Sequence, residues 1–337
     1  MTDSRQPGMR AAILTGSGGP EVLAVREAPR PSPTTGEVLV RVRTSALNRA
    51  DLLQRAGRYP APPGAPADIG GIEFAGEVES LGAQVTGWGP GDRVFAICGG
   101  GAHAEYVVAP ASTLVRIPEG MPWDEAGAIP EAFITAHDAL RTQAGLVSGE
   151  VVVVHAVASG VGLATTQLAH AFGARVFGTT RTAAKLALAR EFGMHDGWVV
   201  SGDFAELRER LAAFSNGPGA DVTIDLLGGP YVAASIEGAA LKGRIVLVGA
   251  IAGSQASLDV RRVLSRRLTL RGTVLRSRST AEKAAASRAF ADEVVPLIAA
   301  GRVRANIDRT FDLADIADAH RWVESNAGAG KVVIRVS

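Results

Sequence analysis

The stretch Val151-Val152-Val153-Val154-His155-Ala156-Val157-Ala158-Ser159-Gly160-Val161-Gly162 decides the fold of this chain. It begins with four consecutive valines, a run that is typical of a strand covered on both faces of a parallel sheet. A turn follows and opens a helix that we predict over residues 160–172. Because backbone N–H groups at a helix N-terminus bind phosphate, this order predicts a site for the pyrophosphate of a dinucleotide. The alternative is an ordinary tight turn.

Strand and helix patterns alternate on the C-terminal side of this stretch. The predicted strands cover residues 175–179, 198–200, 222–225, 243–248 and 268–274, and the predicted helices cover 183–192, 203–214 and 230–240. This α/β alternation predicts a doubly wound parallel sheet of the Rossmann type.

The N-terminal part, from residue 9 to residue 125, follows another pattern. Residues 38–43 alternate apolar and polar side chains, the period of a half-buried strand, and Pro and Gly interrupt the segment throughout. We therefore expect a β-rich domain. The tail is predicted to hold a long helix over 280–300, a shorter helix over 313–326 and a last strand over 331–336, which we expect to return to this first domain.

Length and composition restrict the class of protein. A chain of 337 residues exceeds what one core typically supports, so we expect two domains, and 47% hydrophobic with 20% charged residues is typical of a globular protein. The net charge of +1 gives no argument for binding nucleic acid or an anionic membrane. No apolar run approaches the ~20 residues that cross a bilayer, and residues 1–8 contain no signal core. The single cysteine, Cys98, excludes an intramolecular disulfide framework and fits a cytoplasmic protein.

The residues that follow the second strand predict which cofactor binds. NAD sites place an acid ~20 residues after the turn, whereas here the strand ends in Thr179-Thr180-Arg181 without one. Arg181 can bind a 2′-phosphate in bidentate fashion and Lys185 adds a second positive charge, so we expect NADPH. The alternative for Arg181 and Lys185 is that both cations are simply solvated. Thr135 is expected to bond the cofactor as well, and its alternative role is to cap a helix. The expected cofactor-binding residues are Thr135, Ser159, Gly160, Val161, Gly162, Thr180, Arg181, Lys185, Gly249 and Lys331.

Several motifs resemble one enzyme family along nearly the whole chain. They are Ser45-Ala46-Leu47-Asn48-Arg49-Ala50-Asp51, Arg58-Tyr59-Pro60, Gly71-Ile72-Glu73-Phe74-Ala75-Gly76, Ile129-Pro130-Glu131-Ala132-Phe133 and the turn at 155–162. With them the chain resembles the zinc-independent quinone oxidoreductase branch of the medium-chain dehydrogenase/reductase superfamily. The pattern Leu275-Arg276-Ser277-Arg278 is similar to its tumour-suppressor-inducible subgroup.

The resemblance implies a fold, a reaction and a partner. It implies a GroES-like catalytic domain, residues 1–132 and 278–337, around a Rossmann domain, residues 133–277, with the active site in the cleft between them. It implies NADPH-dependent one- or two-electron reduction of quinones and a homodimer formed through the edge strand near 268–275. Asn48 and Ile72 stand where zinc-dependent relatives have ligands, so no metal is expected. The tyrosine that relatives often place near Val200 is missing here.

Tyr59 and Asn48 are the expected catalytic residues. Tyr59 lies on a proline-rich loop that the family places over the active site, where its hydroxyl could donate to the oxygen that becomes negative on the acceptor. The Asn48 amide could orient nicotinamide ribose or substrate. The alternatives are a tyrosine that packs the loop and a buried asparagine in a turn. Glu73 is expected to be structural and paired with an arginine, His155 to be half-buried and His103 to belong to a turn.

Two other functions remain open. An enone or alkenal reductase would add hydride to a similar electrophilic system, and the sequence does not separate it from a quinone reductase. A low-activity, crystallin-like protein that binds NADPH or RNA is supported only by the arginines between residues 261 and 278. No aromatic side chains are interleaved with these arginines, so we interpret them as solvated and expect no nucleic acid partner.

Overall fold

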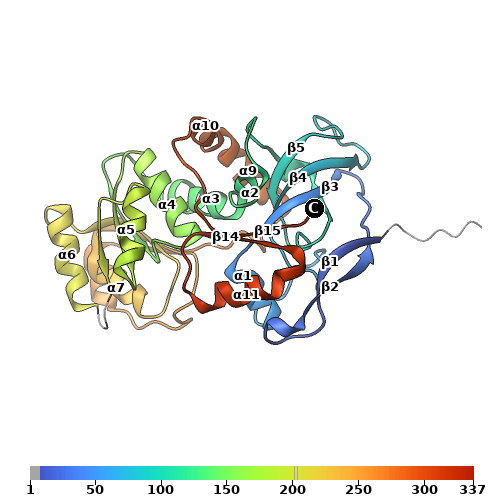
Figure 1. The fold of residues 1–337 in the computed structure, drawn as a ribbon. Coiled ribbons are helices and arrows are strands. Elements are labelled where there is room, and N and C mark those ends of the chain that lie inside the picture. The colour runs from blue at the N-terminus through green and yellow to red at the C-terminus, as the bar shows by residue number, and fades with distance from the viewer. Residues whose placement is uncertain (1–7, 201, 203) are drawn as a thin grey trace, which may run out of the picture. The chain divides into compact units, whose positions relative to one another are not determined.

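The computed structural model describes residues 8–200, 202 and 204–337, and their contacts separate into two units (Figure 1). Unit 1 contains the described part of Met1–Ile134, with Leu275–Ala300 and Arg304–Ser337. Unit 2 contains the described part of Thr135–Val274, with Gly301–Val303. Residues 1–7, which bear on the N-terminal prediction, and residue 203, where a helix was predicted to start, lie outside the described residues. Within the described ranges, no helix is long and apolar enough to cross a membrane.

Unit 2 contains a six-stranded sheet in which every pair of neighbours is parallel. The strands are β8 (Val151–His155), β9 (Arg175–Thr180), β10 (Asp196–Val199), β11 (Ala220–Asp225), β12 (Ala239–Leu247) and β13 (Thr269–Gly272). The helices between them are α4 (Gly160–Ala171), α5 (Ala183–Glu191), α6 (Ala205–Ser215), α7 (Pro230–Gly238) and α8 (Val260–Arg266). The predicted alternation of strands and helices in a parallel sheet is confirmed.

The strand order β10-β9-β8-β11-β12-β13 places β8 at the centre of this sheet. From β8 the chain builds outward through β9 and β10, and then returns to build outward through β11, β12 and β13 on the other side. Ligands of such sheets bind at the carboxyl ends of the strands where this reversal occurs. The turn that follows β8 lies at that point.

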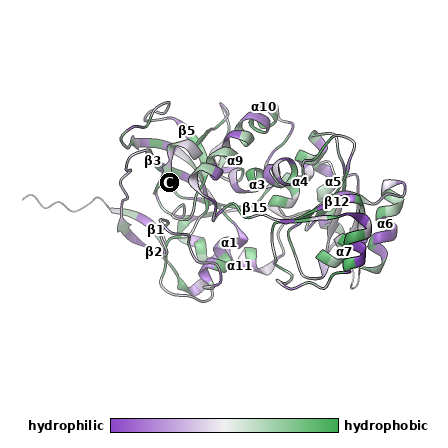
Figure 2. Ribbon diagram, turned by 180° about the vertical axis from the view of Figure 1, so that it is seen from behind, coloured by the Kyte–Doolittle hydropathy of each residue, from purple (hydrophilic) through white to green (hydrophobic). Residues whose placement is uncertain are grey.

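Helices α6 and α7 cover one part of the sheet with their apolar faces, and Figure 2 shows hydrophilic and hydrophobic residues on both. Phe177 of β9 is fully buried, and it packs with Leu207 and Leu211 of α6 and Ala234 of α7 in one cluster. Removing such side chains from water is the main favourable contribution to folding.

Unit 1 is built on a mostly antiparallel sheet with the order β14-β15-β3-β4-β5-β7, and β6 also pairs with β3. Its strands are β3 (Glu37–Leu47), β4 (Glu73–Leu81), β5 (Arg93–Ile97), β6 (Tyr106–Pro110), β7 (Val115–Arg116), β14 (Ile307–Asp312) and β15 (Lys331–Arg335), and β1 (Gly8–Leu14) pairs with β2 (Leu23–Pro29). The helices are α1 (Arg49–Arg55), α2 (Trp123–Gly127), α9 (Thr280–Glu293), α10 (Val295–Ala299) and α11 (Ile316–Ser325). Helix α3 (Pro130–His137) begins in unit 1, and its residues from Thr135 onward belong to unit 2.

The C-terminal tail confirms one prediction and corrects another. Strand β15 pairs antiparallel with β3, so the last strand does return to the first domain. The single helix predicted over 280–300 is wrong, because α9 ends at Glu293 and α10 begins at Val295. Pro296 is the physical reason, since proline has no N–H to donate and its ring clashes with the carbonyl four residues earlier.

His155, at the end of β8, is completely buried and not half-buried as predicted. Its Nδ1 lies 2.8 Å from the Thr179 hydroxyl and its Nε2 lies 3.0 Å from the Ser235 hydroxyl. Because Ser235 already donates its proton to the Tyr231 carbonyl, His155 donates from Nε2 and accepts at Nδ1. Burial lowers the pKa of His155 to about 4, although the charge of Asp225 opposes this.

We predict that the protein loses stability as the pH falls from 6.5 to 4. In this window the unfolded chain protonates His155 and the folded protein does not, so the unfolded state binds more protons and folding becomes less favourable with falling pH. The loss reaches about 3 kcal/mol for a group shifted this far. Denaturant unfolding at several pH values measures it. His155→Gln should make the loss of stability on acidification smaller, and the exposed His170→Gln should not; equal profiles for the two variants would contradict the prediction.

Candidate functional site

The turn after β8 holds α4 close to the strand. Ala156 adopts a positive φ of 54°, and a Cβ on Gly162 would lie 2.4 Å from the Ala156 carbonyl oxygen, so only glycine fits there. Ser159 caps α4, and its hydroxyl accepts a hydrogen bond from the Gly162 N–H at 3.1 Å. Gly160 and Val161 contribute N–H groups at the start of the helix, which have no acceptor within it. These residues fit the pyrophosphate of a dinucleotide.

The end of β9 carries the predicted phosphate-binding cations. Thr180 ends the strand and is buried, and Arg181 is exposed in the following turn. Thr182 caps α5 by accepting from the Lys185 N–H at 3.4 Å, which places Lys185 in the first turn of that helix. No acid occurs between residues 179 and 185. The structure therefore brings Arg181 and Lys185 to one helix start.

Tyr231, which was not predicted from the sequence, belongs to the same edge of the sheet. It lies in the first turn of α7 and packs against the rings of His155, at 5.0 Å, and Phe204, at 4.6 Å between centroids. Burial raises the pKa of Tyr231, and the positive charge of Arg181 opposes this. The chain lacks the tyrosine that relatives often place near Val200. Tyr231 is nevertheless close enough to Arg181 for the arginine charge to affect its pKa. The sequence did carry a signal for Tyr231, because it lies at the start of the helix that follows strand β11, and the carboxyl ends of parallel strands meet at one edge of the sheet.

The structure also places two further predicted cofactor residues, Gly249 and Thr135. A Cβ on Gly249 would lie 2.5 Å from the Leu226 carbonyl oxygen, so glycine at this position lets the ends of β11 and β12 approach. Thr135 is buried inside α3, which corrects the alternative that it caps a helix.

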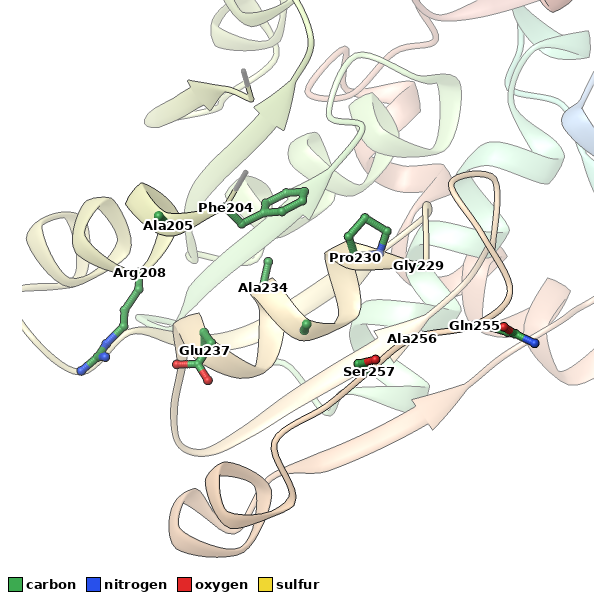
Figure 3. A pocket seen from close by; sticks show the side chains of 11 residues that line it. Phe204, Ala205, Arg208, Gly229, Pro230, Ala234, Glu237, Gln255, Ala256 and Ser257 are labelled. Atoms are coloured by element: carbon green, nitrogen blue, oxygen red, sulfur yellow. The ribbon is translucent and has the colours of Figure 1, made fainter. Parts of the chain in front are cut away.

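A cavity of about 680 Å³ lies on unit 2 between α6, α7 and residues 255–257 (Figure 3). Pro230 and Ala234 of α7 face Phe204 across it, and Arg208 and Glu237 lie toward one end (Figure 3). The residues that line it include none of those predicted from the sequence to bind cofactor or substrate.

The centre of unit 1 is a buried ion pair between Lys331 of β15 and Glu73 of β4. The Lys331 ammonium donates to Glu73 Oε1 at 2.6 Å, to Asn48 Oδ1 at 2.7 Å and to the Leu47 carbonyl at 3.3 Å. The second oxygen of Glu73 accepts from the Glu131 N–H at 2.8 Å. Lys331 is 4% exposed and Glu73 is 0% exposed, so both charges depend on these contacts.

This arrangement corrects the partner predicted for Glu73 and shows which contacts Lys331 and Asn48 make. Glu73 is paired with a lysine and not with an arginine, because Lys331 enters from the adjacent part of the sheet. The Lys331 ammonium, expected to bind cofactor, already bonds three oxygens of unit 1. Both amide hydrogens of Asn48 have acceptors as well, Glu73 Oε1 at 2.7 Å and the Ala46 carbonyl at 3.3 Å. Asn48 therefore has no free N–H to offer a substrate.

Asp51, in the first turn of α1, fixes the backbone around this ion pair. Its two carboxylate oxygens accept from the Asn48 N–H at 2.8 Å and the Gly71 N–H at 2.9 Å. His103 lies close by, with Nε2 3.8 Å from Asp51 Oδ1 and Nδ1 2.8 Å from the Ser45 hydroxyl. His103 is 1% exposed, so it belongs to the interior and not simply to a turn, and burial lowers its pKa. Among the described residues, no three His, Cys, Asp or Glu side chains are grouped to hold a metal ion.

Tyr59 lies on the loop after α1 and is partly buried. The guanidinium carbon of Arg276 lies 5.0 Å from the centre of its ring. Burial raises the pKa of the Tyr59 hydroxyl, and the charge of Arg276 opposes this. A neutral hydroxyl beside a cation can donate a hydrogen bond to an oxygen that becomes negative.

We predict that Lys331→Met destabilises the protein by about 3–5 kcal/mol, because it leaves the Glu73 carboxylate buried without a cation. Adding Glu73→Gln to Lys331→Met should recover much of this loss. Arg335→Met is the matched control, since Arg335 lies on the same strand in an exposed pair with Asp124 and should matter little. Chemical denaturation of the four proteins measures the effects. Equal losses for Lys331→Met and Arg335→Met would contradict the prediction.

Comparisons with known proteins agree with this geometry. Two family models match the chain, the alcohol dehydrogenase GroES-like domain over residues 34–119 and the zinc-binding dehydrogenase over residues 160–291. The chain is 34% identical over 318 residues to a quinone oxidoreductase of Pseudomonas aeruginosa, which covers 94% of this chain and 96% of that protein.

Solved structures with the same fold span both nicotinamide cofactors. A mycobacterial protein complexed with NADPH superimposes with a TM-score of 0.88 at 28% identity, covering 97% of this chain and 100% of that one. An NAD-dependent alcohol dehydrogenase superimposes with a TM-score of 0.85 at 30% identity, covering 98% and 100%. The chain is therefore a medium-chain dehydrogenase/reductase and belongs to the zinc-independent quinone oxidoreductase group of that superfamily.

Proposed function

We propose that the protein is an NADPH-dependent reductase that passes hydride to quinones without a metal ion. The observation that carries this proposal is the contact of the Lys331 ammonium with Glu73 Oε1 and Asn48 Oδ1. A metal ion bound at this place would need these two oxygens as ligands. The Lys331 ammonium already occupies both of them and neutralises the Glu73 carboxylate. A quinone is electrophilic by itself, so its reduction does not require a Lewis acid.

The proposed preference for NADPH rests on Arg181 and Lys185. Both lie at the start of α5, with no carboxylate nearby in the sequence to repel a 2′-phosphate. Ser159, Gly160 and Val161 would hold the pyrophosphate at the start of α4. When bound, the reduced nicotinamide supplies the hydride. The NADPH complex of the mycobacterial structure supports the same choice by similarity.

Tyr59 is the proposed donor to the acceptor. Its partly buried hydroxyl stays protonated at neutral pH and can donate to the acceptor oxygen on which negative charge develops. Asn48 is assigned to holding Glu73 and Lys331 in place, because its amide is used within unit 1.

Reduction of the carbon–carbon double bond of enones is the second candidate. It also ends with a negative oxygen, which Tyr59 would meet in the same way. A nucleic acid partner is not supported, because several of the arginines between residues 261 and 278 are buried or bonded within the protein. Arg276 is 5% exposed, Arg262 donates to the Glu237 carbonyl and Arg271 contacts the Gln143 carbonyl.

We also propose that the protein forms a homodimer through β13, the outer strand of the unit 2 sheet. One side of β13 pairs with β12, and an outer strand offers its other side for pairing. Large apolar side chains are exposed in the same segment, namely Leu258, Val260, Leu264 and Val274. Such a group of residues is typical of an interface.

Light scattering of Val260→Lys/Leu264→Lys should report a monomer where the wild type is a dimer, because two charges would have to be buried on association. Val147→Lys is the control, since Val147 is a similarly exposed apolar residue outside this segment. A dimer that persists in the double variant would reject the β13 interface.

The test of the proposed function is oxidation of NADPH and NADH with an ortho-quinone, a para-quinone and an enone, with and without a chelator. We expect rapid, chelator-insensitive oxidation of NADPH with a quinone. Arg181→Ala should raise KM for NADPH about tenfold, the value of one charge-assisted contact, and change KM for NADH little.

Arg190→Ala is the control for removing a cation from α5, because Arg190 is exposed at the other end of the helix, 3.7 Å from Asp196. Equal effects of Arg181→Ala on both cofactors would remove the NADPH assignment. Turnover of the enone alone would favour the second candidate, and no turnover with any acceptor would reject the reductase.

A further inference from the structure

Arg276 is a buried cation that holds the Tyr59 loop. Its Nε donates to the Gly99 carbonyl at 2.9 Å, and its two terminal nitrogens donate to the Tyr59 carbonyl at 3.3 Å and to Gln54 Oε1 at 2.5 Å. Gln54 is itself oriented, because its amide nitrogen donates to the Ala67 carbonyl at 3.2 Å. One side chain therefore joins α1, the Tyr59 loop and the turn at Gly99.

In the described part of unit 1, the three buried Lys and Arg side chains differ in how their charge is balanced. Lys331 lies 2.6 Å from Glu73, and Arg55 lies 2.9 Å from Glu324. All three hydrogen bonds of Arg276, by contrast, end on uncharged oxygens, although Arg276 is only 5% exposed. A buried charge is costly unless it is compensated, so a guanidinium without a carboxylate partner here needs a reason.

The contact that stands out is the ring of Tyr59, whose centre lies 5.0 Å from the Arg276 guanidinium carbon. The charged neighbours of the Tyr59 hydroxyl are Arg276, which lowers its pKa, and Glu131, which raises it less than burial does. Lys283 is a second cation in the electrostatic surroundings of Arg276, and burial lowers its own pKa. Arg276, and not Lys283, is therefore the cation that acts on the Tyr59 hydroxyl.

We propose that Arg276 is a positioning residue of the acceptor site, which fixes the Tyr59 loop through uncharged oxygens so that its positive charge remains available to the Tyr59 hydroxyl. The proposal rests on the proposed reductase function. The acceptor takes up a hydride, so it gains two electrons and one hydrogen nucleus while the nicotinamide is oxidised. One acceptor oxygen then carries a negative charge until it takes a proton from solvent. Tyr59 donates to this oxygen, and Arg276 makes Tyr59 a better donor.

The first experiment follows the ionisation of tyrosine by ultraviolet absorbance, without cofactor or substrate. The chain has three tyrosines, Tyr59, Tyr106 and Tyr231, and Tyr59→Phe identifies the step of Tyr59. Arg276→Gln should move that step to higher pH by about one unit, because a cation stabilises the phenolate and its removal favours the neutral form. Arg276→Lys keeps the charge and should give a smaller shift. Circular dichroism over the same pH range verifies that each variant is folded.

The second experiment is a double-mutant cycle on turnover. Arg276→Gln should lower kcat at least about tenfold and leave KM for NADPH unchanged, and its effect should be much smaller in the Tyr59→Phe background. Arg93→Gln is the matched control for lost packing, because Arg93 also donates to a carbonyl, that of Met121, and lies 4.1 Å from an aromatic ring, that of Trp123. It should leave both readouts unchanged.

The outcomes separate this proposal from the proposed function. An active enzyme in which Arg276→Gln leaves the Tyr59 step in place, or in which the two substitutions are additive, would overturn the role of Arg276 alone. A wild type that reduces no acceptor would overturn the reductase, and the tyrosine titration would still decide whether Arg276 acts on Tyr59.

Discussion

The ion pair between Lys331 and Glu73 is the interaction on which unit 1 depends. It joins β15, from the end of the chain, to the first residue of β4, and it includes Asn48 and the Glu131 N–H. Four segments that are distant in sequence therefore meet at two buried charges. Because each charge is tolerable only while its partners are in place, the pair specifies how β15, β3 and β4 are arranged as much as it stabilises them.

Asp51 extends this constraint to the backbone. Its carboxylate holds the N–H groups of Asn48 and Gly71, the residues that lead into α1 and toward β4. The side chains at the centre of unit 1 are thus held by hydrogen bonds from the same small region, which limits their motion. Neither Asn48 nor Lys331 has a spare donor in the arrangement, because every side-chain N–H of the two residues already has an acceptor within unit 1.

The sequence predicted the fold better than it predicted the partners of the buried side chains. The four valines of β8 and the regular alternation after them suffice to place the parallel sheet, because burial on both faces leaves a local pattern. Pro296 also carries the signal that separates α9 from α10, and the long helix was predicted in spite of it. The partner of Glu73 left no such signal. Lys331 lies 258 residues away, and only the pairing of β15 with β3 brings the two together. The same holds for Tyr231 and Arg181. They follow strands β11 and β9, and only the strand order of the sheet brings the ends of these strands near each other.

Lys331 and Arg276 are both buried cations of unit 1, but they differ in how far their positive charge acts on neighbouring groups, because only Lys331 is paired with a carboxylate. Lys331 is bound to a carboxylate, so its field is largely cancelled beyond its own contacts. Arg276 is bound to carbonyl and amide oxygens, which satisfy its N–H groups and leave its full charge in place. A site that reduces an acceptor without a metal needs positive charge near the oxygen that becomes negative. Of these two cations, Arg276 is the one whose charge is not cancelled by a carboxylate, and in the proposed reaction the Tyr59 hydroxyl is the group through which that charge would reach the acceptor.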